Sequence, residues 1–287
     1  MRVRVGGIEL FFDVVGARLV PDGAVMRERP TIVCLHGGPG LDHSSLRPDF
    51  DALAGDGQVV YLDQRGHGRS DRSTPDRWSL AQWADDLREF CERLGIERPV
   101  VLGTSFGGYV AMEYAVRHAD HPSKLVLVST SGRGTGDRGR LERMFEAFER
   151  VGGAEAREVT RRLFAERTAE ALADYRRVCG PLYSRRAPDP DASKRTIANE
   201  DVLPYFERPT GEGALFDIRP RLGEVRCPTL VVGGHDDPIT PIAEQRDIAE
   251  AIPANLVRLE EFPDCGHGVI RDDPEKFVRV VSEFVAG

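Results

Sequence analysis

The sequence lacks hydrophobic runs of membrane-spanning length, and its first residues lack the apolar stretch and small-residue cleavage site of a secretory signal. It also has few cysteines, five in 287 residues, and their scattered positions without CxxC spacing predict neither a disulfide framework nor a zinc site. An excess of positive charge is missing as well, because the net charge is −8, and this disfavours binding to nucleic acid or anionic lipid. We therefore expect a cytoplasmic protein without a resident metal that binds neither membranes nor nucleic acids.

Apolar segments of strand length alternate with segments of helical periodicity along most of the chain. The predicted strands are residues 3–5, 8–15, 31–35, 58–62, 99–102, 124–128, 229–232 and 255–259. The first two predict an antiparallel hairpin at the sheet edge, because Gly6 and Gly7 separate them. The predicted helices are residues 79–94, 106–118, 241–252 and 274–285. This order predicts an α/β fold with a mostly parallel sheet of about eight strands and flanking helices.

The alternation of strands and helices stops after residue 131. Three glycines within five residues interrupt the chain there, and charged sequence with helical character follows up to Val178. The next forty residues are rich in proline, aspartate and arginine, and the strand pattern returns only at Thr229. The sequence therefore predicts one core, made of residues 1–131 and 219–287, with a helical cap inserted at residues 132–218.

A Gly-x-Ser-x-Gly motif lies between a predicted strand and a predicted helix. Residues 100–108 read Val-Val-Leu-Gly-Thr-Ser-Phe-Gly-Gly, and a turn this tight needs small residues at positions 103 and 107 because larger side chains would clash. Such a turn presents the Ser105 hydroxyl at the C-terminal edge of the sheet, where open α/β sheets bind ligands. Ser105 is therefore the candidate nucleophile.

A serine hydroxyl needs a base to act as a nucleophile, and this base is normally a histidine held by a carboxylate. The loop after the strand at 229–232 contains Asp236 and Asp237, and the loop after the strand at 255–259 contains His267. Because the C-terminal ends of parallel strands share one edge, we expect both loops on the same side of the sheet as Ser105. The chain thus offers a serine, two alternative aspartates and a histidine, in that order.

The order and placement of these motifs resemble the α/β-hydrolase superfamily over essentially the whole core. The resemblance implies the α/β-hydrolase fold, a catalytic triad and no metal or organic cofactor. It also implies which aspartate is the acid, because in this family the acid follows Gly-x-x and precedes a proline by four positions. That pattern, anchored here by Gly234 and Pro241, selects Asp237 over Asp236, and the Gly-His motif supports His267 as the base.

The negative charge of a tetrahedral intermediate needs preorganised donors, typically two backbone N–H groups. One expected donor is the N–H of Phe106, directly after the nucleophile. By resemblance, the second is the N–H of Gly38 in the His-Gly-Gly-Pro-Gly segment at 36–40. Glycines suit this loop because its backbone must face the substrate, so Gly37 is a candidate substrate-binding residue.

Two loop motifs are more particular than the triad. His-Gly-Gly-Pro-Gly at 36–40 and Asp-Gln-Arg-Gly-His-Gly-Arg-Ser-Asp at 63–71 are similar to the subgroup around proline iminopeptidases. This resemblance implies an enzyme that removes an N-terminal residue and holds its free amine with acidic residues of the cap. Glu200, Asp201 and Glu207 are the candidates by location, although the cap lacks the Trp-Glu sequence of the best-known members.

The expected reaction is hydrolysis of a small-molecule or short-peptide ester or amide through an acyl-enzyme on Ser105. Because of the two loop motifs, we expect an activity most like that of a proline iminopeptidase, an N-terminal aminopeptidase. The missing cap signature makes a carboxylesterase or lactonase without peptidase activity the alternative. A noncatalytic small-molecule receptor is the alternative from a different class, because receptors reuse this fold. A lyase or a cofactor-free perhydrolase would use the same serine and histidine differently.

Overall fold

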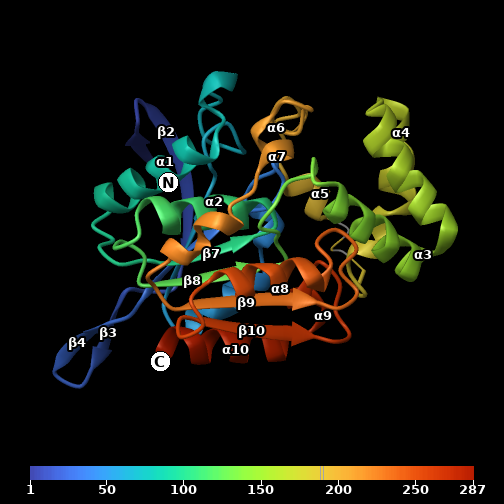
Figure 1. Ribbon diagram of the computed structural model, residues 1–287. Helices are drawn as coiled ribbons and strands as arrows, with labels where there is room; N and C mark the ends of the chain where they lie inside the picture. Colours follow the sequence, from blue (N-terminus) through green and yellow to red (C-terminus); the bar gives the residue numbers. More distant parts are fainter. Residues whose placement is uncertain (188, 190) are drawn as a thin grey trace.

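The structure is a computed structural model that describes residues 1–187, 189 and 191–287. Within this described part, the main sheet has eight strands in the order β1-β2-β6-β5-β7-β8-β9-β10, and a separate hairpin pairs β3 with β4 (Figure 1). The strands of the main sheet are β1 Arg2–Val5, β2 Ile8–Val15, β5 Thr31–Leu35, β6 Gln58–Leu62, β7 Val100–Thr104, β8 Lys124–Val128, β9 Thr229–Gly234 and β10 Val257–Phe262. Within the main sheet, only the β1–β2 and β2–β6 pairs are antiparallel. The predicted mostly parallel, eight-stranded sheet is confirmed.

The central strands are buried on both faces, and their alternate residues belong to two separate hydrophobic clusters. In β7, Val101 packs in the cluster that includes the helices α1 and α2, whereas Val100 and Leu102 pack in the cluster that includes α10. The helices of the core are α1 Leu80–Arg93, α2 Phe106–Arg117, α8 Ile242–Ala251, α9 Val269–Asp272 and α10 Pro274–Ala286. Helices therefore cover both faces, as expected for a parallel sheet.

The start of α1 shows how closely local sequence and structure agree. The Ser79 side chain accepts a hydrogen bond from the Gln82 N–H at 3.2 Å, which caps the helix at the residue predicted from the sequence. Leu87, Phe90 and Cys91 then lie buried along one side of the helix. The amphipathic spacing that predicted the helix is the spacing that packs it against the sheet.

The hairpin of β3 (Leu19–Asp22) and β4 (Val25–Glu28) was not predicted from the sequence. It projects away from the main sheet in Figure 1, and the side chains of Leu19, Val25 and Met26 are exposed. Because neither face of the hairpin is buried, its sequence carries no hydrophobic alternation to mark it as two strands.

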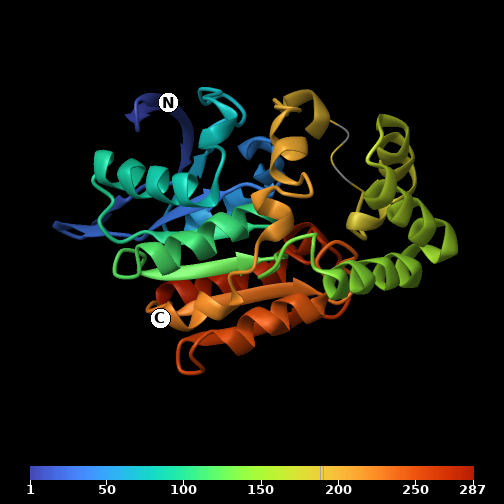
Figure 2. The same cartoon turned by 45° about the horizontal axis from the view of Figure 1, so that its top comes forward.

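The predicted cap segment, residues 132–218, contains helices and loops in its described part. These are α3 Arg138–Glu166, α4 Ala169–Val178, η4 Gly180–Tyr183, α5 Ala192–Arg195, α6 Val202–Phe206 and α7 Glu212–Leu215, and the short helices η1 His43–Leu46, η2 Asp49–Gly55, η3 Pro75–Arg77 and η5 Arg219–Glu224 lie outside it. The helices α3 and α4 lie beyond the edge to which the β9 and β10 arrows point (Figures 1 and 2).

The two ends of the cap segment meet beside the sheet. The Gly134 N–H donates to the Phe216 carbonyl at 2.6 Å, and the Ile218 N–H donates to the Gly132 carbonyl at 2.9 Å. The chain therefore leaves and re-enters the core at one place, and the division into a core and a cap at residues 132–218 stays a prediction. Among the described residues, no helix is both long enough and apolar enough to span a bilayer.

Candidate active site

Ser105 occupies a strained turn between β7 and α2. The strand ends at Thr104, the helix begins at Phe106, and Ser105 has φ +53° and ψ −121°. A non-glycine residue at positive φ costs on the order of 1–3 kcal/mol and persists only where its surroundings enforce it. One such contact is the hydrogen bond from the Ser105 N–H to the Val128 carbonyl of β8, at 3.0 Å.

The glycines on either side of Ser105 are required by close packing. A Cβ atom added at Gly103 would lie 2.3 Å from the Gly107 carbonyl oxygen, and one added at Gly107 would lie 2.2 Å from the Leu35 carbonyl oxygen. Both distances are far below van der Waals contact, so the turn admits no side chain at either position. This is the clash on which the sequence prediction depended.

Thr130, in the loop that follows β8, braces the turn. Its hydroxyl donates to the Ser105 carbonyl at 2.8 Å, and the Gln245 side chain of α8 donates to the Thr130 carbonyl at 2.6 Å. Both side chains are fully buried. Neither residue belongs to a recognisable motif, so sequence reasoning missed them.

The buried Asp237 pairs with the partly buried His267. The His267 Nδ1 atom lies 2.8 Å from Asp237 Oδ2, and because a carboxylate only accepts, Nδ1 carries the proton. Asp237 also accepts from the Ile239 N–H at 2.8 Å, the Thr240 N–H at 2.9 Å and the Thr240 hydroxyl at 2.7 Å. With its carboxylate so fixed, Asp237 orients the imidazole and leaves Nε2 free to accept a proton.

Asp236, the alternative acid, is engaged elsewhere. Its carboxylate accepts from the Arg185 Nε atom at 2.9 Å, and its side chain remains partly exposed. The structure thus brings Asp237, and not Asp236, to His267. The assignment of Asp237 as the catalytic acid remains a prediction, which this geometry supports.

Ser105, Asp237 and His267 follow the C-terminal ends of β7, β9 and β10. These strands run parallel, so all three residues lie at one edge of the sheet. Ser105 Oγ forms no hydrogen bond within the described part of the chain, whereas His267 is bound to Asp237. The arrangement therefore consists of a hydrogen-bonded histidine–aspartate pair and, at the same sheet edge, a serine hydroxyl without a hydrogen bond to a described residue.

The predicted oxyanion donors lie on two elements that flank the serine. A Cβ added at Gly37 would lie 3.3 Å from Ser105 Cβ and 3.8 Å from its Oγ, so this loop passes directly beside the nucleophile. Gly38 has φ +132°, a conformation that favours glycine. Phe106 is the first residue of α2, so its N–H has no acceptor within the helix.

Two buried histidines hold the loops around the site. The His36 Nδ1 atom lies 2.8 Å from the Gly37 carbonyl, and the His67 Nδ1 atom lies 2.8 Å from the Arg65 carbonyl. Burial lowers the pKa of both rings, in His67 to about 3. Both are therefore neutral at physiological pH, which fits the structural role predicted for them.

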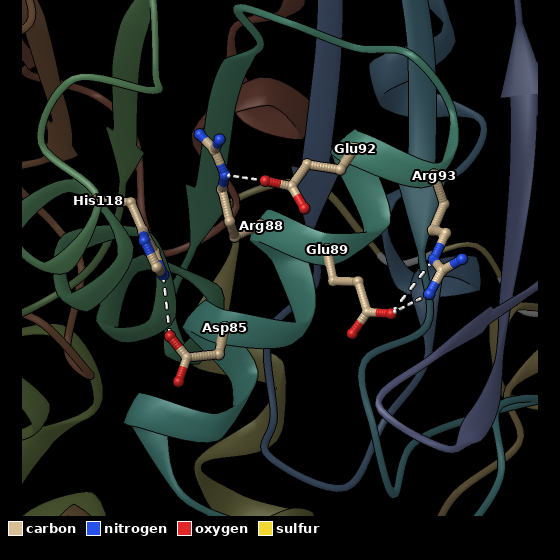
Figure 3. A pocket seen from close by; sticks show the side chains of 6 residues that line it. All are labelled: Asp85, Arg88, Glu89, Glu92, Arg93 and His118. Carbon is tan, nitrogen blue, oxygen red and sulfur yellow. Dashed lines mark hydrogen bonds and ion pairs between the residues drawn. The ribbon is translucent and has the colours of Figure 1, made fainter.

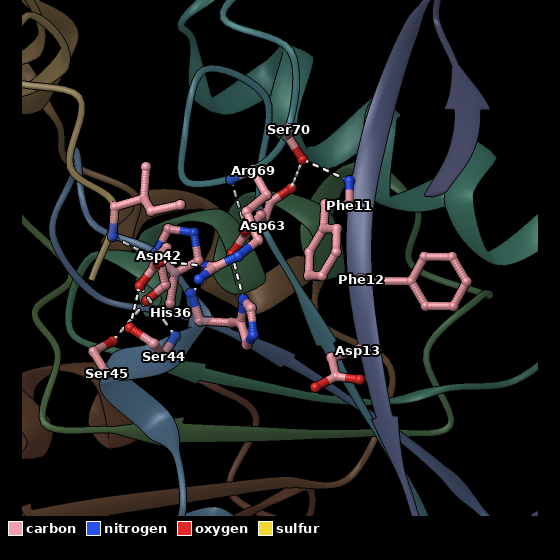
Figure 4. Close-up of polar contacts among 12 residues, drawn as sticks. Phe11, Phe12, Asp13, His36, Asp42, Ser44, Ser45, Asp63, Arg69 and Ser70 are labelled. Carbon is pink, nitrogen blue, oxygen red and sulfur yellow. Dashed lines mark hydrogen bonds and ion pairs between the residues drawn. The ribbon is translucent and has the colours of Figure 1, made fainter. Parts of the chain in front are cut away.

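A network around Asp42 and Asp63 fastens the cap segment to these loops (Figure 4). Asp63 accepts from the His43 N–H and its Nδ1 atom at 2.8 and 2.7 Å, and from the Arg69 N–H at 2.8 Å. Asp42, fully buried, accepts from Arg69 Nη1 at 2.7 Å and from the Ile197 N–H of the cap segment at 2.9 Å. Asp63 thus braces its own turn, as predicted, and Asp42 links that turn to the cap segment.

The cap segment also contacts the histidine directly. The His267 N–H donates to the Tyr183 carbonyl at 2.6 Å, and the two rings lie edge to face with centroids 5.8 Å apart. The Tyr183 hydroxyl lies 2.7 Å from the Tyr175 hydroxyl of α4. Tyr183 of the cap segment therefore holds His267 through its backbone carbonyl and its ring, although no sequence motif includes this tyrosine.

The three predicted amine-binding acids do not come together. Glu200 and Asp201 are exposed just before α6, whereas Glu207 is half-buried beyond its end. Burial raises the pKa of the Glu207 carboxyl, and hydrogen bonding by the Thr135 hydroxyl offsets only part of this effect. Of the three, only Glu207 is enclosed by the structure.

Neither a metal-binding cluster nor the cleft on α1 offers a second candidate site among the described residues. Among the described residues, no cluster of three or more histidine, cysteine, aspartate or glutamate side chains could hold a metal ion. A cleft of about 510 Å³ lies on α1, where Arg88 pairs with Glu92 and Arg93 with Glu89 (Figure 3). Because the charges of this cleft are paired with one another and exposed, it is a solvated helix surface.

Comparison with known proteins identifies the family. The family model described as the alpha/beta hydrolase fold matches residues 30–274, so the chain belongs to this family and the predicted fold is confirmed. The proline iminopeptidase PfmaB of Pestalotiopsis fici is 28% identical over 84% of this chain and 87% of its own length. The chain is therefore a hydrolase of this family with a proline iminopeptidase-like relationship.

Solved structures show the same relationship. The proline iminopeptidase of Mycobacterium smegmatis is 26% identical, with a TM-score of 0.77 over 100% of this chain and 97% of that one. The enol-lactonase of Burkholderia xenovorans is also 26% identical, with a TM-score of 0.68 over the full length of both chains. Enzymes with different substrates thus share this fold at similar identity.

Proposed function

We propose that the protein is a serine hydrolase in which Ser105, His267 and Asp237 form the catalytic triad. The observation that carries this proposal is the partly buried His267–Asp237 hydrogen bond at the sheet edge that also presents the strained Ser105. The fixed Nδ1 proton leaves Nε2 as the base, which is the orientation that the reaction requires.

In the proposed reaction, His267 Nε2 takes the proton of the Ser105 hydroxyl while Oγ attacks the substrate carbonyl. The N–H groups of Gly38 and Phe106 stabilise the oxyanion, and a single donor of this kind contributes about 3 kcal/mol in other enzymes. The protonated His267 then gives its proton to the leaving group, and an acyl-enzyme remains. Water, deprotonated by His267, attacks the acyl carbon and releases the acid and free Ser105.

For the substrate, we favour esters or lactones. A bound ammonium group needs a carboxylate that faces it in the site, but Glu200 and Asp201 are exposed, and the Glu207 carboxylate already accepts a hydrogen bond from the Thr135 hydroxyl. The positive charge of Arg140 also acts on Glu207 and would repel an ammonium group. The full-length similarity to an enol-lactonase supports the same class.

An N-terminal aminopeptidase is the second candidate. It is supported by the loop motifs at 36–40 and 63–71 and by the similarity to proline iminopeptidases. Such an enzyme would bind a free amine next to the scissile bond. The cap segment would then have to supply a negative charge there in the presence of substrate.

Parallel assays of p-nitrophenyl acetate, p-nitrophenyl butyrate and prolyl-p-nitroanilide separate these possibilities, with Ser105→Ala as the control. We expect turnover of the esters that Ser105→Ala lacks. Faster turnover of the anilide, measured as kcat/KM, would replace the ester assignment with the aminopeptidase. Absence of turnover of all three, with retained binding of small ligands, would support the noncatalytic receptor.

A further inference from the structure

Arg140 is a buried cation that forms no close ion pair with any residue that the structure describes. It lies in the first turn of α3, and only 5% of the residue is exposed. Its Nε and Nη1 atoms are fully buried and form no hydrogen bond with any described residue. By contrast, the equally buried Arg65 and Arg133 form ion pairs with Asp86 at 2.6 Å and Glu244 at 3.1 Å.

The buried, unbonded nitrogens of Arg140 are energetically costly. Burying guanidinium nitrogens that form no hydrogen bond removes their hydration without replacing it, and the nearby charge of Glu207 offsets this cost only through space. Buried charges are therefore normally paired, as the other two arginines are. A charge that remains unpaired in the free protein is explained if a ligand supplies the partner.

The groups around Arg140 place it between the cap segment and the nucleophile helix. Its charge acts on Tyr109, which belongs to the first turn of α2 four residues after Ser105, and on Glu207 of the cap segment. The Tyr109 ring stacks on Phe216 with centroids 4.5 Å apart. Arg140 is thus close enough to act on the first turn of α2, the helix start that carries the proposed oxyanion donor.

Aromatic side chains of α2 and of the cap segment pack against one another near this helix start. Phe206 of α6 contacts Phe106 with ring centroids 5.4 Å apart, in an edge-to-face arrangement. Burial raises the pKa of Tyr109 to about 12, so its hydroxyl stays neutral, and that hydroxyl donates to the Arg133 carbonyl at 3.2 Å. In these apolar surroundings a cation attracts an anion strongly, because little water screens the interaction.

We infer that Arg140 binds a carboxylate of the substrate, so that the enzyme prefers esters or lactones that carry a negative charge away from the scissile bond. A carboxylate matches the planar guanidinium fork with two parallel hydrogen bonds. This inference rests on the proposed function, because it assigns the substrate class of the same site.

Calorimetric titration with glutarate tests the site without catalysis. We expect glutarate to bind the wild type and Ser105→Ala with similar affinity, and the neutral diamide glutaramide to bind neither. Arg140→Gln should weaken glutarate binding at least about tenfold, because it removes a charge-assisted pair. Arg138→Gln is the matched control, since Arg138 lies in the same helical turn but is exposed, and it should bind glutarate like the wild type.

Competition supplies a second readout. Glutarate should inhibit p-nitrophenyl acetate turnover by the wild type competitively, and the inhibition constant should rise by the same factor in Arg140→Gln. Absence of glutarate binding to the wild type, or equal binding to Arg140→Gln, would overturn the inference. If no ester were turned over but Arg140-dependent glutarate binding persisted, the proposed hydrolase would fail while the anion site stood.

A purely structural Arg140 would behave differently. If Arg140 served only as the counter-charge of Glu207, Arg140→Gln and Glu207→Gln would each lower the unfolding temperature, and the double variant would lower it no further. Glutarate binding would then be unaffected by either change in the protein that remains folded. That pattern would also overturn the inference.

Discussion

The core side and the cap side of the site differ in how their polar groups are satisfied. On the core side, Asp237 receives four hydrogen bonds, including the one from His267. On the cap side, the buried Arg140 has no partner for two of its nitrogens, and Glu207 has a raised pKa. The difference teaches that the proposed catalytic acid is already fixed by hydrogen bonds in the free protein, whereas the cap segment contains buried polar atoms that, in our proposal, a substrate satisfies.

The largest effect should come from the core side. Ser105→Ala removes the proposed nucleophile, and kcat for the best ester should fall by a factor on the order of 10⁶. The measurement is steady-state turnover of p-nitrophenyl esters, with unfolding by heat to show that the variant is folded. Turnover within tenfold of the wild type would mean that the reactive group lies elsewhere and that the comparison of the two sides fails.

The next effect separates the two aspartates. Asp237→Asn should lower kcat by about 10⁴, because an amide would favour the wrong histidine tautomer. Asp236→Asn loses only a partly exposed ion pair with Arg185 and should change kcat less than about threefold. The comparison of kcat between these neighbouring variants is internally controlled, and a larger loss from Asp236→Asn would reverse the assignment.

Close packing at the nucleophile turn predicts a loss of stability. Gly107→Ala places a methyl group 2.2 Å from the Leu35 carbonyl oxygen, and such overpacking should cost at least about 1–3 kcal/mol of unfolding free energy. Gly55→Ala is the control, because a Cβ at Gly55 meets nothing within 4 Å. Urea unfolding of both variants checks this, and equal midpoints would show that the turn is less tightly packed than described.

The smallest effect concerns the ion pair between Arg246 and Glu261. Arg246 and His235 hold the Glu261 carboxylate, and hydrogen bonding from Arg246 lowers the pKa of Glu261 to about 2. A lowered folded pKa stabilises the protein above about pH 4.3, the unfolded value, and this stability is lost as pH falls toward 2. Because the pair is partly exposed, Glu261→Gln should cost at most about 1 kcal/mol at pH 7 and less at pH 3. Urea unfolding at both pH values measures this, and a cost that grew toward acid pH would contradict the sign.

The core could be predicted from the sequence because its physics is periodic and local. Strands buried on both faces appear as continuous apolar runs, and the capping serine at residue 79 marks the start of a helix. The turn at Ser105 could be anticipated because it tolerates only glycine at residues 103 and 107. Local constraints of this kind leave a motif in the sequence.

The cap side could not be predicted in the same way, because its important contacts join distant segments. Arg140 reads as an ordinary charge of an arginine-rich helix, and only the fold shows that it is buried without a partner. Tyr183 and Thr130 likewise contact the reactive residues through tertiary structure alone. The three acids were chosen by location, and only Glu207 is enclosed.

The most direct test of the central claim is covalent trapping of the nucleophile. The wild type is treated with a fluorophosphonate, which phosphonylates activated serines, and the intact protein and its peptides are analysed by mass spectrometry. We predict a single label on Ser105, with none on Ser105→Ala and greatly slowed labelling of His267→Ala. A label on another residue, or equal labelling of Ser105→Ala, would contradict the account.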